Sequence, residues 1–103
     1  MNVVDAIKHV TNQRSLGFED MASVMTDIMT GKTTDAQNAA FLVGLQMKGI
    51  KVSEILGGAS VMRELSTKVD VEGDNSILVD TCGTGGSGSN KFNVSTASAF
   101  VAA

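Results

Sequence analysis

The residue types best suited to chemistry in this sequence gather near its C-terminal end, where glycines alternate with small hydroxyl side chains. The segment GTGGSG at residues 83–88 holds four glycines, and Asn93, Ser95 and Thr96 follow it. Glycine lets a backbone N–H group approach an anion without interference from a Cβ atom, and a helix N-terminus adds unpaired donors and partial positive charge. This combination indicates a site that holds phosphate.

Two short elements are expected to position the glycine-rich loop. The run ILV at residues 77–79 has the length and β-branched content of a buried strand, which continues through Asp80 into the loop. The small apolar residues at 97–103 are typical of the first turns of a buried helix, and we predict Ser95 as its N-cap. The single cysteine, Cys82, has no basic neighbour to activate it and is expected to be a small core residue.

Three other interpretations of the glycine-rich loop remain open. Residues 83–88 fit GxGxxG, the dinucleotide-binding fingerprint, but its helix should open inside the motif, whereas polar residues 89–91 intervene here. A P-loop would carry lysine where Ser89 stands. A flexible surface loop without a binding role is the structural alternative, although a bare linker has no need of the polar cluster at 93–96.

The loop and the helix after it also carry a specific resemblance. The sequence DTCGTGG at 80–86, followed by FNVSTASAFVAA at 92–103, resembles the first signature of the anthranilate phosphoribosyltransferase family. Further matches cover nearly the whole chain: Met29-Thr30-Gly31, Gln37, Ala40-Phe41-Leu42, Lys48-Gly49, Glu54-Ile55 and Met62-Arg63. Two positions depart from the pattern, because the family usually has Asp where Ser87 stands and a small hydroxyl residue where Lys91 stands.

The resemblance implies an enzyme of tryptophan biosynthesis that transfers the 5-phosphoribosyl group from phosphoribosyl diphosphate to anthranilate and releases diphosphate. It implies that the loop and helix start bind phosphoribosyl diphosphate through Gly83, Gly86, Ser87, Lys91, Asn93, Val94, Ser95 and Thr96. It also implies that Gly83 lies near anthranilate and that the Ser95 hydroxyl helps to ligate Mg²⁺. No catalytic residue is identified in this portion, since the family's Lys-His-Gly-Asn segment, its anthranilate-contacting arginine and its Asp-Glu pair for Mg²⁺ would come later.

Composition narrows the class of protein. A chain of 103 residues is one domain at most, or a piece of one, and its 43% hydrophobic content allows a core to form. A net charge of −3 argues against nucleic acid or an anionic membrane surface as the main partner. No apolar run approaches the ~20 residues of a membrane span. The single cysteine and the lack of a signal-peptide pattern favour a reducing cytoplasm.

The first 72 residues predict a helical domain. Apolar spacing indicates four helices, at about 2–13, 18–30 and 34–48, and from Val52 or Ser53 to about Leu65. Thr34 and Gln37 form a capping box, and glycines 31 and 49 are expected to end the second and third helices.

Two features of this domain concern packing. The third helix is apolar over most of its circumference, as expected for a helix buried on two sides, and Gly57-Gly58 in the fourth indicates close packing. His9 is expected to be an ordinary surface residue. By family resemblance the helical domain contributes to a homodimer interface.

We therefore predict a mostly α-helical chain in two parts. Residues 1–72 form the N-terminal helical domain, and residues 73–103 hold the first strand, glycine-rich loop and helix start of an α/β domain like that of nucleoside phosphorylases and phosphoribosyltransferases. The lone strand and the uncapped apolar end predict an N-terminal portion of a longer protein. Two other functions stay open: a pyrimidine nucleoside phosphorylase of related fold, which would have lysine where Thr81 stands, or a non-catalytic helical association module.

Overall fold

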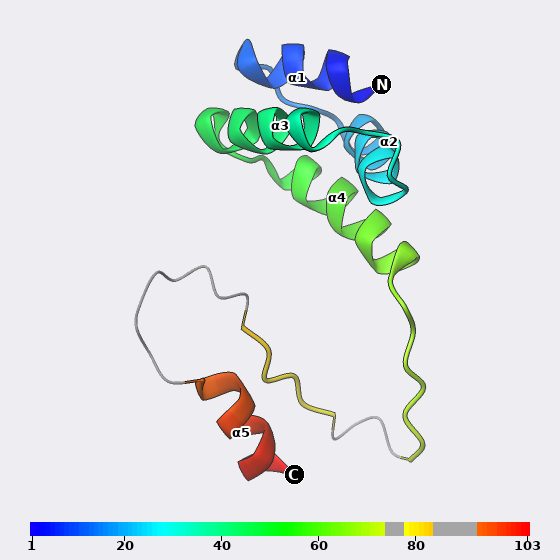
Figure 1. Ribbon diagram of the computed structural model, residues 1–103, viewed down its shortest axis with the longest axis vertical. Coiled ribbons are helices and arrows are strands. Elements are labelled where there is room, and N and C mark those ends of the chain that lie inside the picture. Colours follow the sequence, from blue (N-terminus) through cyan, green and yellow to red (C-terminus); the bar gives the residue numbers. More distant parts are fainter. Residues whose placement is uncertain (74–77, 84–92) are drawn as a thin grey trace. The chain divides into compact units, whose positions relative to one another are not determined.

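The computed structural model describes residues 1–73, 78–83 and 93–103, which form two compact units, Met1–Lys68 and Val69–Ala103. Four helices belong to the first unit and one to the second (Figure 1): α1 Val3–Thr11, α2 Phe18–Met29, α3 Asp35–Lys48, α4 Val52–Leu65 and α5 Val94–Ala102. The prediction of a mostly helical chain is confirmed.

The strand predicted at 77–79 is not formed by its described residues. Leu78 and Val79 have no regular secondary structure, and Ile77 lies outside the described part. A strand is defined by pairing with another strand, and none is assigned within 1–73, 78–83 and 93–103.

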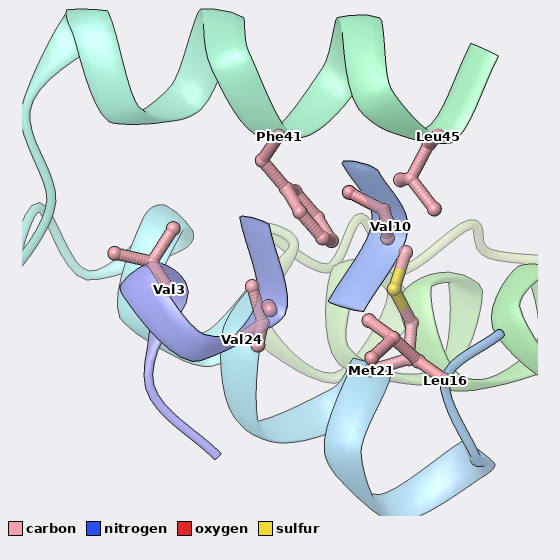
Figure 2. Packing of buried hydrophobic residues seen from close by; sticks show 8 residues of the cluster. Val3, Val10, Leu16, Met21, Val24, Phe41 and Leu45 are labelled. Atoms are coloured by element: carbon pink, nitrogen blue, oxygen red, sulfur yellow. The ribbon is translucent and has the colours of Figure 1, made fainter. Parts of the chain in front are cut away.

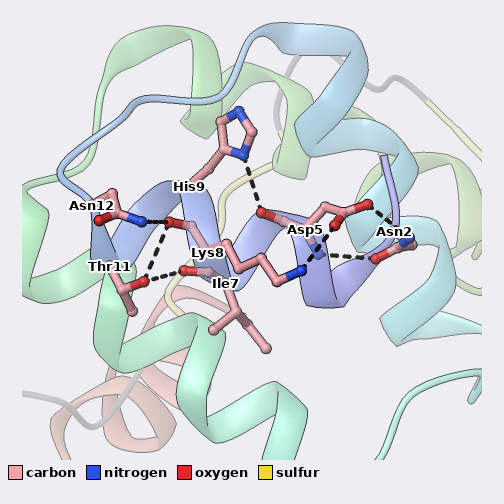
Figure 3. A network of polar contacts seen from close by, with 7 residues as sticks. All are labelled: Asn2, Asp5, Ile7, Lys8, His9, Thr11 and Asn12. Carbon is pink, nitrogen blue, oxygen red and sulfur yellow. Dashed lines mark hydrogen bonds and ion pairs between the residues drawn. The ribbon is translucent and has the colours of Figure 1, made fainter.

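The N-terminus of helix α1 is capped by a side chain, which accepts a backbone N–H that has no acceptor within the helix. The Asn2 side chain accepts the Asp5 N–H at 2.9 Å and donates to the Asp5 carboxylate at 2.9 Å. Figure 3 shows that further polar contacts along α1 also stay within the helix, including one between His9 Nδ1 and the Asp5 carbonyl at 3.1 Å. His9 is thus engaged with its own helix, in keeping with a structural role.

The remaining helix boundaries follow local signals. Thr34 Oγ1 accepts the Gln37 N–H at 3.2 Å, while the Gln37 side chain accepts the Thr34 N–H at 3.0 Å, so the predicted capping box is confirmed. Gly49, which ends α3, has a φ of +85°, a conformation that costs glycine little. Helix α4 starts at Val52, the earlier of the two predicted positions.

The core of the first unit lies where α1 packs on α3 and α2 packs on α4. Figure 2 shows Phe41 and Leu45 of α3 pointing toward Val10 of α1, with Val24 of α2 close by. The buried cluster comprises Val3, Ala6, Val10, Leu16, Met21, Val24, Phe41 and Leu45. Burying a side chain of this size fully contributes about 1.5–3 kcal/mol to the stability of the unit.

Two glycines bring helices into close contact. A Cβ atom on Gly57 of α4 would lie 2.6 Å from the Phe18 carbonyl oxygen at the start of α2. A Cβ atom on Gly44 of α3 would lie 2.5 Å from Val10 Cγ2 of α1. Both distances are shorter than a Cβ atom can approach another atom to which it is not bonded, so the helices pack at this spacing only because glycine stands there. The prediction of close packing at Gly57 is confirmed.

A buried carboxylate joins the segment before α2 to the start of α4. Glu54 is 0% exposed, and its Oε1 accepts the Leu16 N–H at 2.8 Å. Its Oε2 accepts the Lys51 N–H at 2.7 Å and pairs with Lys48 Nζ at 2.9 Å. Ser53 Oγ donates to the Leu16 carbonyl at 3.2 Å, so both backbone groups of Leu16 are held by the first turn of α4.

Helix α3 is buried on one face in this structure, which corrects the prediction of burial on two sides. Phe41 and Leu45 are in the core, whereas Leu42, Val43 and Met47 are exposed, Met47 by 77%. Among the described residues α3 packs mainly on α1, and the exposed side chains on its other face stay uncovered.

Candidate functional site

The candidate site lies in the second unit, where residues 78–83 precede the glycine-rich loop and α5 follows it. Gly86, Ser87 and Lys91, three of the predicted phosphoribosyl diphosphate ligands, lie outside the described residues. The structure describes the remaining five: Gly83, Asn93, Val94, Ser95 and Thr96.

The start of α5 is organised by Asn93, and the prediction of Ser95 as N-cap is wrong. The Asn93 side-chain oxygen accepts the Thr96 N–H at 3.2 Å, and the helix begins at Val94. An amide oxygen can cap a helix as well as a hydroxyl can, and Asn93 is the residue whose backbone lies outside the helix. Ser95 therefore stands inside the first turn, and its hydroxyl does not serve as the cap.

Gly83 and Ser95 are brought together by the fold. A Cβ atom on Gly83 would lie only 3.1 Å from Ser95 Oγ, so the backbone before the glycine-rich loop approaches the first turn of α5 directly. In a helix the N–H groups of the first turn, here at Val94 and Ser95, have no intrahelical acceptor. Glycine backbone, a hydroxyl and helix-start donors therefore gather in one place, as an anion site requires.

Asp80 and Cys82 form a turn immediately before Gly83. Asp80 Oδ1 accepts the Cys82 N–H at 2.8 Å, the contact typical of aspartate two residues before the donor. This hydrogen bond is the main cause that lowers the pKa of the Asp80 carboxyl, which is therefore ionised at neutral pH.

Cys82 is exposed, which corrects the prediction of a core position. Within the described part of the chain nothing covers this side of the turn. A hydrogen bond to the Asp80 carboxylate, and then the charge of that carboxylate, raise the pKa of the Cys82 thiol. The thiol is therefore kept protonated and is poorly suited to act as a nucleophile.

An open pocket of about 370 Å³ lies beside this turn and α5. Its lining is largely apolar, with the polar groups of Ser95 and Thr96 in the wall: Thr81, Cys82, Ser95, Thr96, Ala99, Phe100 and Ala103. In the described ranges, no three His, Cys, Asp or Glu side chains converge as a metal-binding group. The described residues thus supply hydrogen bonding and a hydroxyl oxygen, not a complete cation site.

Sequence reasoning identified Gly83 and the start of α5 as site residues, but it gave Asp80 no role beyond its place in the motif. The available signal was its position, because aspartate two residues before a backbone donor often closes a turn. Sequence alone did not distinguish Asn93 from Ser95 as the cap, since both are good N-cap residues.

None of the helices in the described segments is long and apolar enough to cross a membrane. No solved structure matches the chain significantly. Two domain families do match: the helical bundle domain of the glycosyl transferase family at residues 4–66 and the a/b domain of that family at residues 75–103.

Curated relatives match over the full chain. It is 60% identical over 103 residues to the anthranilate phosphoribosyltransferase of Saccharophagus degradans. It is 54% identical to the protein of that name from Hahella chejuensis and 53% identical to that from Ectopseudomonas mendocina, again over 103 residues. All of this chain is covered in each case, but only 30%, 29% and 29% of the respective relative. The chain therefore belongs to the glycosyl transferase family, and it holds the helical bundle domain and part of the a/b domain of that family.

Proposed function

We propose that the protein transfers the 5-phosphoribosyl group from phosphoribosyl diphosphate to the amine of anthranilate, giving N-(5-phosphoribosyl)anthranilate and diphosphate in tryptophan biosynthesis. The observation that carries the proposal is the close approach of Gly83 to the Ser95 hydroxyl at the start of α5, in a chain 60% identical throughout to a protein named for this reaction. A pyrimidine nucleoside phosphorylase is not favoured, because Thr81 stands where its lysine would be.

The physics of the reaction suits the residues at hand. Displacement at the anomeric carbon builds positive charge on the sugar and negative charge on the departing diphosphate. The protein therefore has to position both substrates and stabilise an anion, without a nucleophile of its own. Gly83, Gly86 and Ser87 would place backbone donors against phosphoribosyl diphosphate, and Gly83 would also border anthranilate. Lys91 would add positive charge, and residues 93–96 would hold the diphosphate at the helix start.

The Ser95 hydroxyl fits a role as one ligand of Mg²⁺. It is an oxygen donor that does not cap the helix, and Mg²⁺ takes oxygen ligands and commonly keeps phosphate oxygens and water beside a few protein ligands. When bound, Mg²⁺ would neutralise charge on the diphosphate. The lack of a carboxylate cluster in the described segments agrees with a site that draws its other ligands from substrate and from elsewhere in the protein.

The same proposal includes a cytoplasmic homodimer. The exposed apolar face of α3, with Leu42, Val43 and Met47, supports an interface through the helical domain, because such faces on soluble proteins usually mark association sites. The single cysteine supports a reducing compartment.

The proposed function is tested in the complete protein by following anthranilate consumption with phosphoribosyl diphosphate and Mg²⁺. We expect Ser95→Ala to lower kcat/KM by about tenfold or more and to raise the Mg²⁺ concentration needed for half-maximal rate, because one hydrogen-bonding or ligating oxygen is lost. Ser98→Ala, an exposed serine on the same helix, is the matched control and should stay within about twofold. A parent protein that leaves anthranilate untouched but cleaves a pyrimidine nucleoside with inorganic phosphate would show that the proposed reaction is wrong.

A further inference from the structure

The Asp80 carboxylate is a charged group beside the candidate site to which the proposed function assigns no role. Asp80 stands outside the residues that the family resemblance assigns to the substrates, yet its Oδ1 accepts the Cys82 N–H at 2.8 Å. A negative charge near a diphosphate site is unfavourable for binding, so a carboxylate there is expected to have a structural role that offsets this cost. The hydrogen bond to Cys82 is such a task.

The hydrogen bond between Asp80 and the Cys82 N–H can influence the position of Gly83 because Cys82 and Gly83 are neighbours in the chain. The Cys82 N–H belongs to the Thr81–Cys82 peptide, and Cys82 directly precedes Gly83. Once that peptide is held, only the φ and ψ angles of Cys82 remain free between the held plane and the backbone of Gly83. The space between the Gly83 backbone and the Ser95 hydroxyl is small, because a Cβ atom on Gly83 would lie 3.1 Å from Ser95 Oγ. A rotation of the Cys82–Gly83 peptide would change the distance between the Gly83 backbone and the hydroxyl of α5.

We propose that Asp80 is a positioning residue of the phosphoribosyl diphosphate site, which holds the Cys82 amide and thereby sets how closely Gly83 approaches the Ser95 hydroxyl. The inference rests on the proposed function. It assigns the effect to the hydrogen-bond acceptor and not to the negative charge, because the contact is made by one carboxylate oxygen on a backbone N–H. The two contributions can be separated by substitution.

The test compares Asp80→Ala with Asp80→Asn in the complete protein. Alanine removes the acceptor, so we expect the Kd for phosphoribosyl diphosphate, measured by calorimetry with Mg²⁺, to rise by about tenfold or more. We expect the KM for anthranilate to change by less than about threefold. Asparagine retains a side-chain oxygen that accepts the Cys82 N–H, and it should recover most of the lost affinity. Asp70→Ala, an exposed acidic residue of the same unit, is the control for a change in net charge.

A second measurement reports whether the Asp80 carboxylate lies beside the Cys82 thiol. Iodoacetamide alkylation of Cys82, followed by the mass of the peptide that contains it, reports the thiolate fraction as a function of pH. The Asp80 carboxylate raises the pKa of the thiol. Both Asp80→Ala and Asp80→Asn should therefore shift the alkylation profile to lower pH, because both remove the charge, although only alanine weakens substrate binding.

The outcomes separate the two proposals. A parent that binds phosphoribosyl diphosphate, with Asp80→Ala within about twofold of it, overturns the positioning role alone. Asparagine as damaging as alanine also overturns it, because the charge would then be the active feature. An unchanged alkylation profile in both variants would show that the Asp80 carboxylate does not lie beside Cys82, which would overturn the placement on which the positioning role depends. A parent that binds no phosphoribosyl diphosphate overturns the proposed function, and the positioning role with it.

Discussion

Among single residues, Glu54 has the most demanding environment in the described chain. Its carboxylate is 0% exposed, and Lys48 is its only charged partner in the described segments, at 2.9 Å. Burial raises the pKa of the Glu54 carboxyl, but the N–H donors of Leu16 and Lys51 and the Lys48 ammonium outweigh it, so the pKa lies below its usual value. The charge is therefore retained because both carboxylate oxygens accept hydrogen bonds and a cation lies beside one of them.

We expect Glu54→Gln to lower the free energy of unfolding by about 3 kcal/mol at pH 7, because the buried Lys48 ammonium loses its counter-charge. Chemical denaturation of the 103-residue chain measures the change. Glu64→Gln, an exposed glutamate on the same helix, is the matched control and should stay within about 0.5 kcal/mol. A loss at Glu54 no larger than the loss at Glu64 would contradict the role assigned to the pair.

The same variant should change the pH dependence of stability. Because folding lowers the pKa of Glu54, its contribution is fully present above the unfolded pKa of about 4.3 and is lost as pH falls through the folded pKa. The parent should lose stability more steeply than Glu54→Gln below about pH 5. Parallel curves for the two proteins between pH 7 and pH 3 would show that Glu54 has the same pKa in both states.

Among the helices, the packing of α4 on α2 depends on the order of two neighbouring glycines. Gly57 faces the Phe18 carbonyl, with 2.6 Å available to a Cβ atom, whereas a Cβ atom on Gly58 would lie 3.4 Å from the flexible end of Met21. Both residues are buried in the same helix, so they share the intrinsic cost of glycine, roughly 1 kcal/mol against alanine. Only the tertiary contact differs.

Alanine substitution should therefore have opposite effects at these positions. Gly57→Ala forces α2 and α4 apart against a backbone atom, and we expect it to destabilise the chain by about 1–3 kcal/mol despite the gain in helix propensity. Gly58→Ala should be neutral or stabilising by up to about 1 kcal/mol, because Met21 can shift its methyl group. Thermal and denaturant unfolding of both variants checks the difference, and equal effects would rule out the contact with Phe18 as its cause.

At the scale of the whole molecule, the two units differ in how well they are covered. The first unit has a buried core, whereas α5 has no buried residue and Phe100 is 81% exposed. A nine-residue helix with no buried residue is marginal in water. The matched relatives extend well beyond the 30% of their length that this chain covers, so they have further residues that could cover these apolar surfaces.

We predict that residues 1–103 alone consume no anthranilate and bind phosphoribosyl diphosphate more weakly than millimolar. Lys91 is the only basic residue from 78 to 103, and one lysine with one helix N-terminus offers about 1–3 kcal/mol. Millimolar affinity corresponds to about 4 kcal/mol. Anthranilate fluorescence and calorimetry on the purified chain test this.

Hydrogen exchange of the same chain should show protected amides in α1 to α4 and fast exchange in α5.

Turnover above a protein-free control, with longer contaminants excluded by intact mass, would contradict the prediction. It would mean that residues 1–103 are sufficient for the reaction. Slow exchange in α5 would show that the second unit is stable by itself, and the argument from its exposed side chains would then be wrong.

What the sequence determined by itself was set by near neighbours. The capping box of Thr34 and Gln37 needs only four consecutive residues, and the glycine ends of α2 and α3 need only a residue that tolerates positive φ. The motif around Gly83 and Ser95 likewise identified the candidate site, because its residue types occur in a fixed order along the chain.

Tertiary structure alone decided the features that depend on distant partners. The Glu54 carboxylate is buried and charged because a backbone N–H 38 residues earlier, at Leu16, comes within 2.8 Å of it. The structure leaves no room for a Cβ atom at Gly57 but leaves room for one at Gly58, because only the first faces a backbone carbonyl. The exposure of Cys82 has the same origin, since burial depends on what packs against a residue and not on its type. Local sequence sets what a segment can form, and long-range packing decides which of its groups are covered.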